Sequence, residues 1–350
     1  MPSPGPPENG MGVVDPCATP GWDEWIGRLA GVSFFHGRPW AEVLSRSYGY
    51  RPCYLLMRSG ETPCGLLPLM EVKSALTGKR GVSLPFSDKA PVLAPDEGSF
   101  ERLFRGAIAL GRERGWRGIE LRGAPLPPGT PSVAGFLEHE LALDRGEKEL
   151  FRGLHPATRR NVLRAQKESL ETVFPSGAEA MRVFYRLHCK TRRGHGLPPQ
   201  PWRFFETLRS RVIDAGHGVV AMALHNGVPV AAAVFLFFRG QVLYKFGASE
   251  ENALPLRPNN LLFWEAIRRF RDQGFRTLHF GRTDRQNEGL ARFKRGWGAE
   301  ERLLLYHRFD LQGSSFVNGG KGPGSSYRVF RLLPVPVLRL IGALLYRHLG

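Results

Sequence analysis

The sequence VVAMALHNGVPVAAAVF, residues 219–235, decides the fold of the second half of the chain. It contains two apolar runs, which are separated by His225, Asn226 and Gly227. Because an Asn-Gly pair tolerates the positive φ angles of a tight turn, this pattern predicts a β-hairpin. A stretch in the first half, YLLMRSGETPCGLLPL at residues 54–69, has the same order of strand, glycine turn and strand.

Each predicted hairpin is followed by the same succession of elements. More strand comes first, then a helix, then a short strand after a glycine. The helices are expected at residues 100–114 and 260–272, and the short strands at 115–122 and 274–282. Two copies of one succession indicate an internal repeat, so we expect an α/β (α+β) protein in which one fold is used twice.

The composition indicates a folded and strongly basic protein. Lys and Arg total 49 against 32 Asp and Glu, a net charge of +17, and nine of the 49 are Lys, which leaves 49 − 9 = 40 Arg. With 42% hydrophobic residues the chain can bury a core, which excludes wholesale disorder. The charge favours polyanionic partners such as nucleic acid, anionic lipid or phosphate-bearing substrates. A GC-rich genome is the alternative source of the arginines.

The cysteines and the N-terminus indicate a cytoplasmic protein. The four cysteines, at positions 17, 53, 64 and 189, form no Cys-x-x-Cys pair, and no histidine stands at a zinc-ligand spacing from them. We therefore expect reduced thiols and no metal site. Residues 1–20 lack the basic and apolar regions of a signal peptide and are expected to be a disordered lead.

Turn-rich segments divide the rest of the chain. We expect a first domain over 21–147 and a second over 148–311. The sequence QGSSFVNGGKGPGSS, residues 312–326, predicts a flexible linker. The tail 327–350 is apolar and basic, and no acid follows Asp310. Such a tail suits peripheral contact with an anionic membrane, or a helix docked on the protein body.

Several motifs between residues 33 and 310 resemble a known family. They are SFFHGRPW (33–40), GLLPL (65–69), PATRRNVLRAQK (156–167), FY (184–185), PNNLLFW (258–264), FGRTD (280–284) and FKRGWG (293–298). Together with the order hairpin, strand, helix and strand, they resemble the FemAB/FemX-like tandem-GNAT aminoacyltransferases. The nearest branch is the one associated with exopolysaccharide and protein-sorting gene clusters.

The resemblance implies both an architecture and a reaction. It implies two tandem GNAT-like domains with mixed, mostly antiparallel sheets flanked by helices. The implied reaction moves an amino acid from aminoacyl-tRNA, the co-substrate, to an amine of a nucleotide- or lipid-linked peptidoglycan precursor or a related cell-envelope acceptor. No other cofactor is implied. The protein would act in the cytoplasm, with the inner face of the membrane as a place of peripheral contact.

The sequence departs from this pattern at two places. The family carries a lysine shortly after the tryptophan of the first motif, whereas Leu44 stands near that position and Arg46 follows it. The glycine-rich loop that holds the pyrophosphate of acyl-CoA is absent before both helices, where PDEGS (95–99) and LRPNN (256–260) stand. Two alternatives therefore stay open. One is an N-acyltransferase that uses acyl-CoA or acyl-carrier protein on an amino sugar of a surface polysaccharide, and the other is a non-catalytic basic module that binds nucleic acid or membrane.

Lys294 is the predicted catalytic residue. It is one of nine lysines among 40 arginines, so a drift toward arginine has spared it. The resemblance places a lysine here next to the reacting ester, where an ammonium can stabilise a developing oxyanion or hold the terminal phosphate of the tRNA. A solvated lysine on a helix face is the alternative. Its neighbour Phe293 is predicted to line the substrate site.

Three arginines are predicted phosphate contacts. Arg159 and Arg160 begin a basic helix, which Thr158 is expected to cap, and a helix start with two arginines suits a phosphate. Arg282 directly follows a short strand, and strand ends are common places for binding residues. A solvated face and a local salt bridge are the respective alternatives.

Three further residues complete the predicted substrate-binding set. Tyr244 lies on a strand, where its hydroxyl could hydrogen-bond a substrate or be satisfied in the core. Asn259 and Asn260 stand at an expected helix N-cap, and capping alone would explain at least one of them. We expect direct attack of the amine on the ester without a covalent enzyme intermediate, and Cys189 with His195 is not expected to form a catalytic pair.

Overall fold

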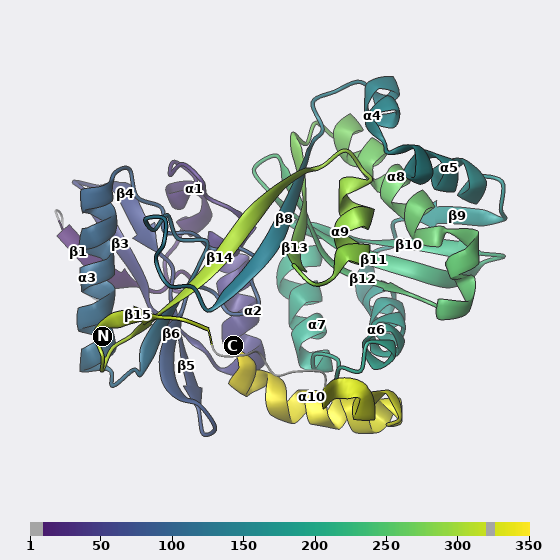
Figure 1. The fold of residues 1–350 in the computed structure, drawn as a ribbon. Coiled ribbons are helices and arrows are strands. Elements are labelled where there is room, and N and C mark those ends of the chain that lie inside the picture. The colour runs from purple at the N-terminus through teal and green to yellow at the C-terminus, as the bar shows by residue number, and fades with distance from the viewer. Residues whose placement is uncertain (1–9, 320–325) are drawn as a thin grey trace. The chain divides into compact units, whose positions relative to one another are not determined.

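The hairpin predicted at residues 219–235 is confirmed. Strands β10 (Gly218–His225) and β11 (Val228–Phe238) pair antiparallel, and the turn residues Asn226 and Gly227 have φ angles of 50° and 77°. These positive angles are the reason for the Asn-Gly pair. The structure is a computed structural model that describes residues 10–319 and 326–350, and Figure 1 shows the fold.

The described residues divide into two units, and both units are built from separate segments of the chain. The first unit holds residues 10–135, 304–319 and 346–350, and the second holds 136–303 and 326–345. Strand β14 (Glu300–Asp310) and helix α10 (Val335–Leu349) cross these boundaries. Contiguous domains at 21–147 and 148–311 were expected. Turn signals mark breaks along the chain, but they do not show that a later segment packs back on an earlier unit.

The first unit contains two small sheets and a long helix. One sheet has the order β1-β3-β4, and the other runs β2-β5-β6-β7-β14, with β15 on β14. The remaining elements of this unit are β1 (Gly10–Val14), α1 (Trp22–Ile26), η1 (Phe34–His36), α2 (Arg38–Tyr48), β2 (Arg51–Pro52), β3 (Tyr54–Ser59), β4 (Thr62–Leu67), β5 (Met70–Ser74), β6 (Gly78–Val82), α3 (Glu97–Glu113), β7 (Gly118–Arg122) and β15 (Ser315–Val317).

The second unit is built on a sheet with the order β8-β13-β12-β11-β10-β9. Besides β10 and β11 it contains β8 (Ala134–Ala142), α4 (Glu147–Gly153), α5 (Pro156–Ala165), β9 (Leu170–Val173), α6 (Gly177–Gly194), α7 (Trp202–Leu208), η2 (Arg209–Ile213), β12 (Gln241–Ser249), η3 (Glu251–Leu256), α8 (Pro258–Asp272), β13 (Thr277–Asp284), α9 (Glu288–Arg295) and η4 (Ser326–Arg331).

The internal repeat appears as one arrangement in both units. In the first, the antiparallel strands end at β6, α3 follows, and β7 returns parallel to β6. In the second, they end at β12, α8 follows, and β13 returns parallel to β12. Most strand pairs in these sheets are antiparallel, and each unit has one parallel pair joined by a crossover helix. The presence of this arrangement in both units confirms the mixed α/β fold with two similar halves.

Each unit packs its crossover helix on its sheet through a separate apolar core. In the first unit, Leu103 and Ala107 of α3 meet Leu55, Leu67 and other strand residues. In the second unit, α8 supplies a continuous buried face. That face consists of Leu262, Phe263, Ala266, Ile267 and Phe270. The 3.6-residue period of these positions explains why the sequence forms a helix there.

Two segments that were expected to lack structure contain strands. Gly10–Val14 lies within the expected disordered lead 1–20, yet it forms β1 and pairs antiparallel with β3. Ser315–Val317 lies within the expected linker 312–326, yet it forms β15 on β14. These expectations were wrong for the two strands, because edge pairing supplies the hydrogen bonds that weak local propensity does not predict. Residues 1–9 and 320–325 of these two predictions lie outside the described residues.

His36 holds the SFFHGRPW motif in place through its ring. The backbone N–H of Ser33 donates to Nδ1 at 3.1 Å, and Nε2 lies 3.0 Å from the carbonyl oxygen of Pro91. This pattern needs the neutral ring, with the proton on Nε2. The side chain is completely buried, and burial lowers the pKa of His36 to about 4.

We predict that His36 makes the first unit sensitive to acid. Its pKa lies below the ordinary 6.5, so its contribution is fully present above pH 6.5 and is lost as the pH falls toward 4. At full protonation the loss is about 3 kcal/mol of unfolding free energy. Urea unfolding over this pH range should show a smaller decline for His36→Gln, whose amide can accept and donate at the same places. His217→Gln, at an exposed position, should retain the wild-type decline.

Candidate active site

Strands β12 and β13 diverge after three paired residues, which opens the sheet of the second unit at their carboxyl ends. The parallel ladder joins Gln241 to Thr277, Val242 to Leu278 and Leu243 to His279, and then it stops. In an open sheet, the crevice at the carboxyl ends of strands is where ligands bind. Beyond this point β12 stays paired with β11 and β13 stays paired with β8, each with one shift in register.

A β-bulge in β13 lies where the strands part. His279 pairs with Glu140 of β8 and Arg282 pairs with Glu138, so Phe280 and Gly281 together face the single residue His139. Such a two-against-one bulge bends a strand and frees its backbone groups from the ladder. Gly281 has a φ of 69°, which glycine adopts without strain.

Lys294 binds the carbonyl groups of this bulge. It lies on α9, which packs on β13 (Figure 1), and its Nζ donates to the carbonyl oxygens of Gly281 at 2.9 Å and Arg282 at 3.2 Å. The side chain is only 2% exposed, so the alternative of a solvated lysine is wrong. The ammonium thus positions the backbone at the point of divergence, and its contact with a reacting ester stays a prediction.

His139 is a buried neutral base beside this lysine. Its Nε2 lies 2.8 Å from Oε2 of Glu301, and burial lowers its pKa, an effect that Lys294 strengthens and Glu301 opposes. A neutral ring that donates Nε2–H to Glu301 presents a lone pair on Nδ1. Within the described residues, His139 Nδ1 and the hydroxyl of the buried Thr283 have no hydrogen-bond partner. Both groups therefore keep the capacity to form a further hydrogen bond.

The sequence did not single out His139, Thr283 or Glu301. His139 lies in the alternating stretch FLEHELA, where no spacing to Lys294 is meaningful before the register of β8 on β13 is known. The usable signal would have been the glycine at position 281, because a glycine inside a strand pattern often marks a bulge.

Arg282 and Phe293 flank the cluster but have different surroundings. Arg282 is exposed, and its guanidinium carbon lies 4.5 Å from the ring centroid of Phe136. It pairs in register with Glu138 across the strands. Phe293 packs against Phe263 at a centroid distance of 5.4 Å and belongs to the core. The structure therefore leaves Arg282 accessible to a ligand and gives Phe293 a packing role.

Tyr244 is the first residue of β12 beyond the parallel ladder. Its ring packs edge-on against Phe263 at 4.7 Å, and burial raises the pKa of its hydroxyl. The hydroxyl also lies over Gly247, where a Cβ atom would be only 1.9 Å from it. Glycine at position 247 is therefore required for this placement of the ring. The ring packs on Phe263 of the core, and its hydroxyl lies over the backbone of Gly247.

Asn259 and Asn260 do not cap α8, so the capping interpretation was wrong. The helix begins at Pro258, and the residue at the cap position is Arg257, with a φ of 62° and no side-chain cap. The two asparagines are therefore inside the first turn. Asn259 Nδ2 donates to Oγ of Ser249, at the end of β12, at 3.5 Å, and Asn260 is buried. The contact of these two residues with a substrate stays a prediction.

Arg159 and Arg160 occupy the first turns of α5, but only Arg160 is exposed to solvent. Arg159 donates to the carbonyl oxygens of Arg152 at 2.7 Å and Leu154 at 3.3 Å, so it closes the C-terminal end of α4. Arg160 makes no ion pair with any described residue. Of the two, Arg160 is the one whose charge is available to a phosphate.

The cap of α5 also differs from the expectation. His155 is the cap residue, and its Nδ1 accepts from the backbone N–H of Ala157 at 3.2 Å. Thr158 is buried one turn later and faces Gly296, where a Cβ atom would lie 2.3 Å from its hydroxyl. The start of α5 is thus packed on the end of α9, which brings Arg160 and Lys294 onto neighbouring elements.

Neither a metal centre nor a cysteine nucleophile is built from the described residues. They contain no group of three or more metal-ligating side chains. Burial raises the pKa of the Cys189 thiol, which opposes formation of the nucleophilic thiolate. His195 lies near arginines and has a lowered pKa, chiefly through burial.

Residues 157–295 match the family model described as an acetyltransferase (GNAT) domain. Over 79 residues the chain is 32% identical to the lipid II:glycine glycyltransferase of Staphylococcus haemolyticus (strain JCSC1435). This match covers 21% of the chain and 19% of that relative, so the chain spans less than a fifth of the length of the curated relative it matches.

Three solved structures share the fold. The crystal structure of FemX has a TM-score of 0.64 at 13% identity, over 81% of this chain and 94% of that chain. A tandem GNAT protein from the clavulanic acid biosynthesis pathway has a TM-score of 0.52 at 14% identity, over 86% and 98% of the two chains. L-PGS from Bacillus licheniformis has a TM-score of 0.51 at 12% identity, over 91% and 95%.

We predict that Lys294→Met weakens both folding and turnover. Two buried carbonyl oxygens would lose their donor, at a cost of about 1–3 kcal/mol in unfolding free energy. If the ammonium also acts at the ester, acyl transfer by the folded variant should fall by roughly 100-fold or more. Denaturant unfolding and transfer rates, measured on the same preparation, separate the two effects.

Arg292→Met is the matched control, because Arg292 is an exposed cation on the same helix. It should leave both quantities near the wild-type values. A folded Lys294→Met variant with wild-type turnover would limit this lysine to positioning the bulge.

Proposed function

We propose that this chain, in which residues 157–295 match a GNAT acetyltransferase domain and whose fold is similar to that of FemX, is an aminoacyltransferase. In this proposal the donor is aminoacyl-tRNA, and the acceptor is an amine of a peptidoglycan precursor or a related cell-envelope molecule. The short match to a lipid II:glycine glycyltransferase supports the class of reaction. The same matches to an enzyme fold speak against a non-catalytic basic module.

The choice of aminoacyl-tRNA as the donor rests on the residues at the start of α8. Acyl-CoA enzymes of this fold hold the pyrophosphate on the backbone N–H groups of a glycine-rich loop at this helix. Here η3 runs to Leu256, Arg257 occupies the turn with a side chain, and Pro258 has no N–H to give. The cradle lacks both its glycines and one of its donors, which supports a donor that is held by side-chain charge instead.

The proposed reaction needs no covalent enzyme intermediate. The acceptor amine attacks the ester carbonyl carbon, a C–N bond forms, and the C–O bond to the terminal ribose breaks. The nitrogen loses one proton, and the departing ribose oxygen gains one. Positive charge at Lys294 would favour the anionic tetrahedral stage, and the lone pair of His139 Nδ1 is an acceptor for the migrating proton.

Helix α2 supplies a reason to test more than one acceptor. The family's phosphate-binding lysine would stand near Leu44, which is completely buried. Arg46 is exposed on another face of the helix, so it does not take over that position. This supports an alternative acceptor such as an amino sugar of a surface polysaccharide, with acyl-CoA or acyl-carrier protein as the alternative donor.

A transfer assay read by mass tests the proposal. The protein is incubated with a mixed pool of charged tRNA and an extract of cell-envelope precursors. We expect one acceptor to gain the mass of one amino-acid residue, with loss of the gain after ribonuclease treatment. An acetyl increment in the presence of acetyl-CoA, together with tight binding of acetyl-CoA by calorimetry, would contradict the tRNA donor.

We further predict that Arg160→Ala and Arg159→Ala have different effects. Arg160→Ala should raise the KM for aminoacyl-tRNA by roughly 5- to 10-fold, lower its salt dependence and leave the stability unchanged. Arg159→Ala removes two bonds to carbonyl groups at the end of α4 and should cost about 1–3 kcal/mol in unfolding free energy. Equal KM values for Arg160→Ala and wild type would remove this arginine from the donor site.

A further inference from the structure

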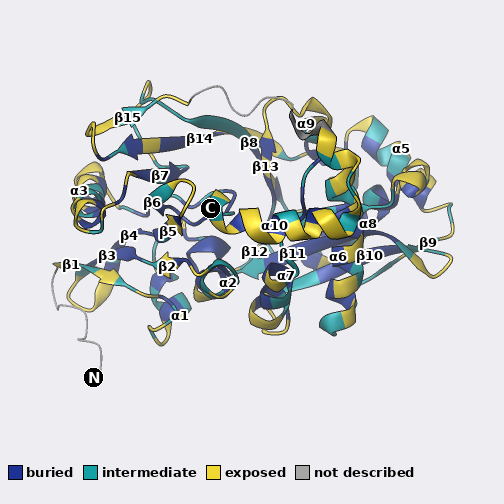
Figure 2. Cartoon of the chain, turned by 90° about the horizontal axis from the view of Figure 1, so that it is seen from below, coloured by how far each residue is buried: buried dark blue, intermediate teal, exposed yellow. Residues whose placement is uncertain are grey.

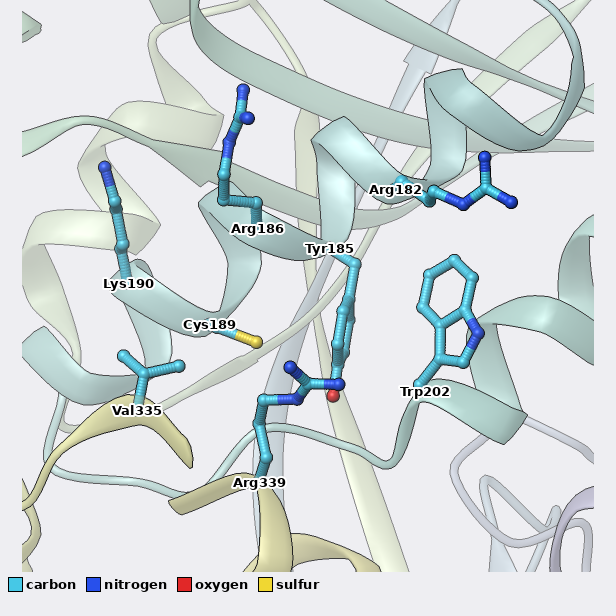
Figure 3. Close-up of a pocket in the computed structure, with 8 residues that line it drawn as sticks. All are labelled: Arg182, Tyr185, Arg186, Cys189, Lys190, Trp202, Val335 and Arg339. Carbon is cyan, nitrogen blue, oxygen red and sulfur yellow. The ribbon is translucent and has the colours of Figure 1, made fainter. Parts of the chain in front are cut away.

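A pocket with aromatic walls lies between α6 and α10 in the second unit, apart from the Lys294 cluster in sequence and in lining residues. Its volume is about 500 Å³. Figure 3 shows its lining, which consists of Arg182, Tyr185, Arg186, Cys189, Lys190, Trp202, Val335 and Arg339. Four of these eight residues are basic and none is acidic, so the pocket suits a ligand with an apolar body and a negative group.

The aromatic side chains fix the shape of the pocket and one of its arginines. The rings of Tyr185 and Trp202 lie 5.1 Å apart, and the Tyr185 hydroxyl donates to the carbonyl oxygen of Gln200 at 3.2 Å. The guanidinium carbon of Arg339 lies 5.3 Å from the centroid of the Tyr185 ring. This cation–π contact holds Arg339 at the pocket without neutralising its charge.

Two of the four basic groups keep an uncompensated charge. Arg182 forms an ion pair with Glu179, and Lys190 forms one with Glu250. Arg186 and Arg339 have no acidic partner among the described residues, and both are exposed. The pair can therefore bind an anion without first breaking a salt bridge.

Helix α10 has one face fixed to the protein and another that no described residue covers. Leu338 is buried, and the backbone at Gly342 approaches Pro199 so closely that a Cβ atom would lie 2.0 Å from its carbonyl oxygen. Val337, Leu340 and Leu344 follow at helical spacing on another face, and the latter two are 62% and 61% exposed. Leu332, just before the helix, is 84% exposed. Figure 2 shows much of α10 in the colour of exposed residues.

We propose that this face of α10 binds an anionic lipid bilayer, with Arg186 and Arg339 contacting lipid phosphates at the pocket. The stripe formed by Leu332, Val337, Leu340 and Leu344, hereafter the leucine stripe, enters the boundary between head groups and acyl chains. The aromatic pocket takes the glycerol and upper acyl part of a phospholipid whose phosphate the two arginines bind.

Charge complementarity is what selects a membrane as the occupant. All the charged side chains after Asp310 are basic, and the leucine stripe lies within this segment. An exposed apolar stripe on a basic helix is the pattern of helices that lie in the plane of an anionic membrane surface. No helix among the described residues is long and apolar enough to cross a bilayer. The proposed mode is therefore contact along one surface.

Vesicle co-sedimentation of the full chain tests this proposal. Wild type should bind phosphatidylcholine vesicles that contain phosphatidylglycerol at least tenfold better than vesicles of phosphatidylcholine alone, and salt should weaken the binding. The double variant Leu340→Asp/Leu344→Asp should lose binding to both. Arg186→Gln/Arg339→Gln should weaken binding to the anionic vesicles by about 30-fold, because each arginine at the membrane surface contributes roughly fivefold to the affinity.

Matched controls exclude general effects of the substitutions. Leu76→Asp introduces one acidic side chain at a leucine of similar exposure, and Arg203→Gln removes an exposed arginine that follows Trp202 in the chain; neither should change vesicle binding. Equal binding to neutral and anionic vesicles would overturn the proposal. So would a leucine-stripe variant that binds normally, or one whose only change is dissociation of a dimer in sedimentation velocity, because a second copy would then cover the stripe.

The outcome is separable from that of the proposed function. Transfer from aminoacyl-tRNA to a water-soluble acceptor does not require a bilayer, so the leucine-stripe variant should retain it. Wild-type vesicle binding by a protein that fails the transfer assay would leave the membrane surface in place and remove only the proposed donor.

Discussion

The bulge of β13, held by the ammonium of Lys294, is the constraint on which the candidate site depends. A parallel pair that continued past Leu243 and His279 would close the sheet of the second unit. The carbonyl oxygen of Gly281 in the bulge and that of Arg282 just after it need a donor where they are removed from water. Lys294 supplies it from α9, so the opening between strands and the packing of that helix are maintained by the same hydrogen bonds.

Burying this ammonium constrains its neighbours as well. An ammonium removed from water is costly unless polar groups surround it, and a second positive charge beside it would add to that cost. His139 adds no second positive charge, because burial and Lys294 both favour its neutral ring. Its Nε2–H donates a hydrogen bond to the carboxylate of Glu301. The result is a cluster that combines the Lys294 ammonium, the Glu301 carboxylate and the lone pair of His139 Nδ1. This arrangement suits a reaction in which negative charge develops and a proton must leave an amine.

The fold could be predicted from the sequence to the extent that local patterns carry it. The Asn226-Gly227 turn, the apolar face of α8 and the repeated order of elements are all local, and the structure contains them. Strands β1 and β15 form by pairing with other strands, β3 and β14. Their short sequences have weak strand propensity, so this pairing could not be predicted from them. The units are interrupted for the same reason, since β14 and α10 return after long excursions.

The candidate site shows the same limit at the level of side chains. Lys294 could be selected from its rarity and its motif, whereas its acceptors are backbone carbonyl groups that no sequence pattern displays. His139 and Thr283 emerge only when β8 and β13 are aligned across the bulge. The capping roles expected for Thr158 and for Asn259 or Asn260 were wrong, because the helix caps are His155 and Arg257, two or three residues earlier in the chain. Shifts of that size are small for the fold and decisive for the role of a side chain.

The surplus of arginine acquires meaning only when each charge is placed. Many arginines pair with a nearby acid on an exposed helix, as Arg38 does with Glu42 and Arg105 with Glu101. Such pairs contribute at most about 1 kcal/mol each, so stability does not account for so basic a chain. The arginines without an acid are the informative ones. Arg160 lies on α5 beside the active-site helix, and Arg186 and Arg339 lie at the aromatic pocket. An uncompensated guanidinium is most favourable next to a phosphate, which is why we propose Arg160 as a contact to the donor and Arg186 and Arg339 as contacts to a lipid.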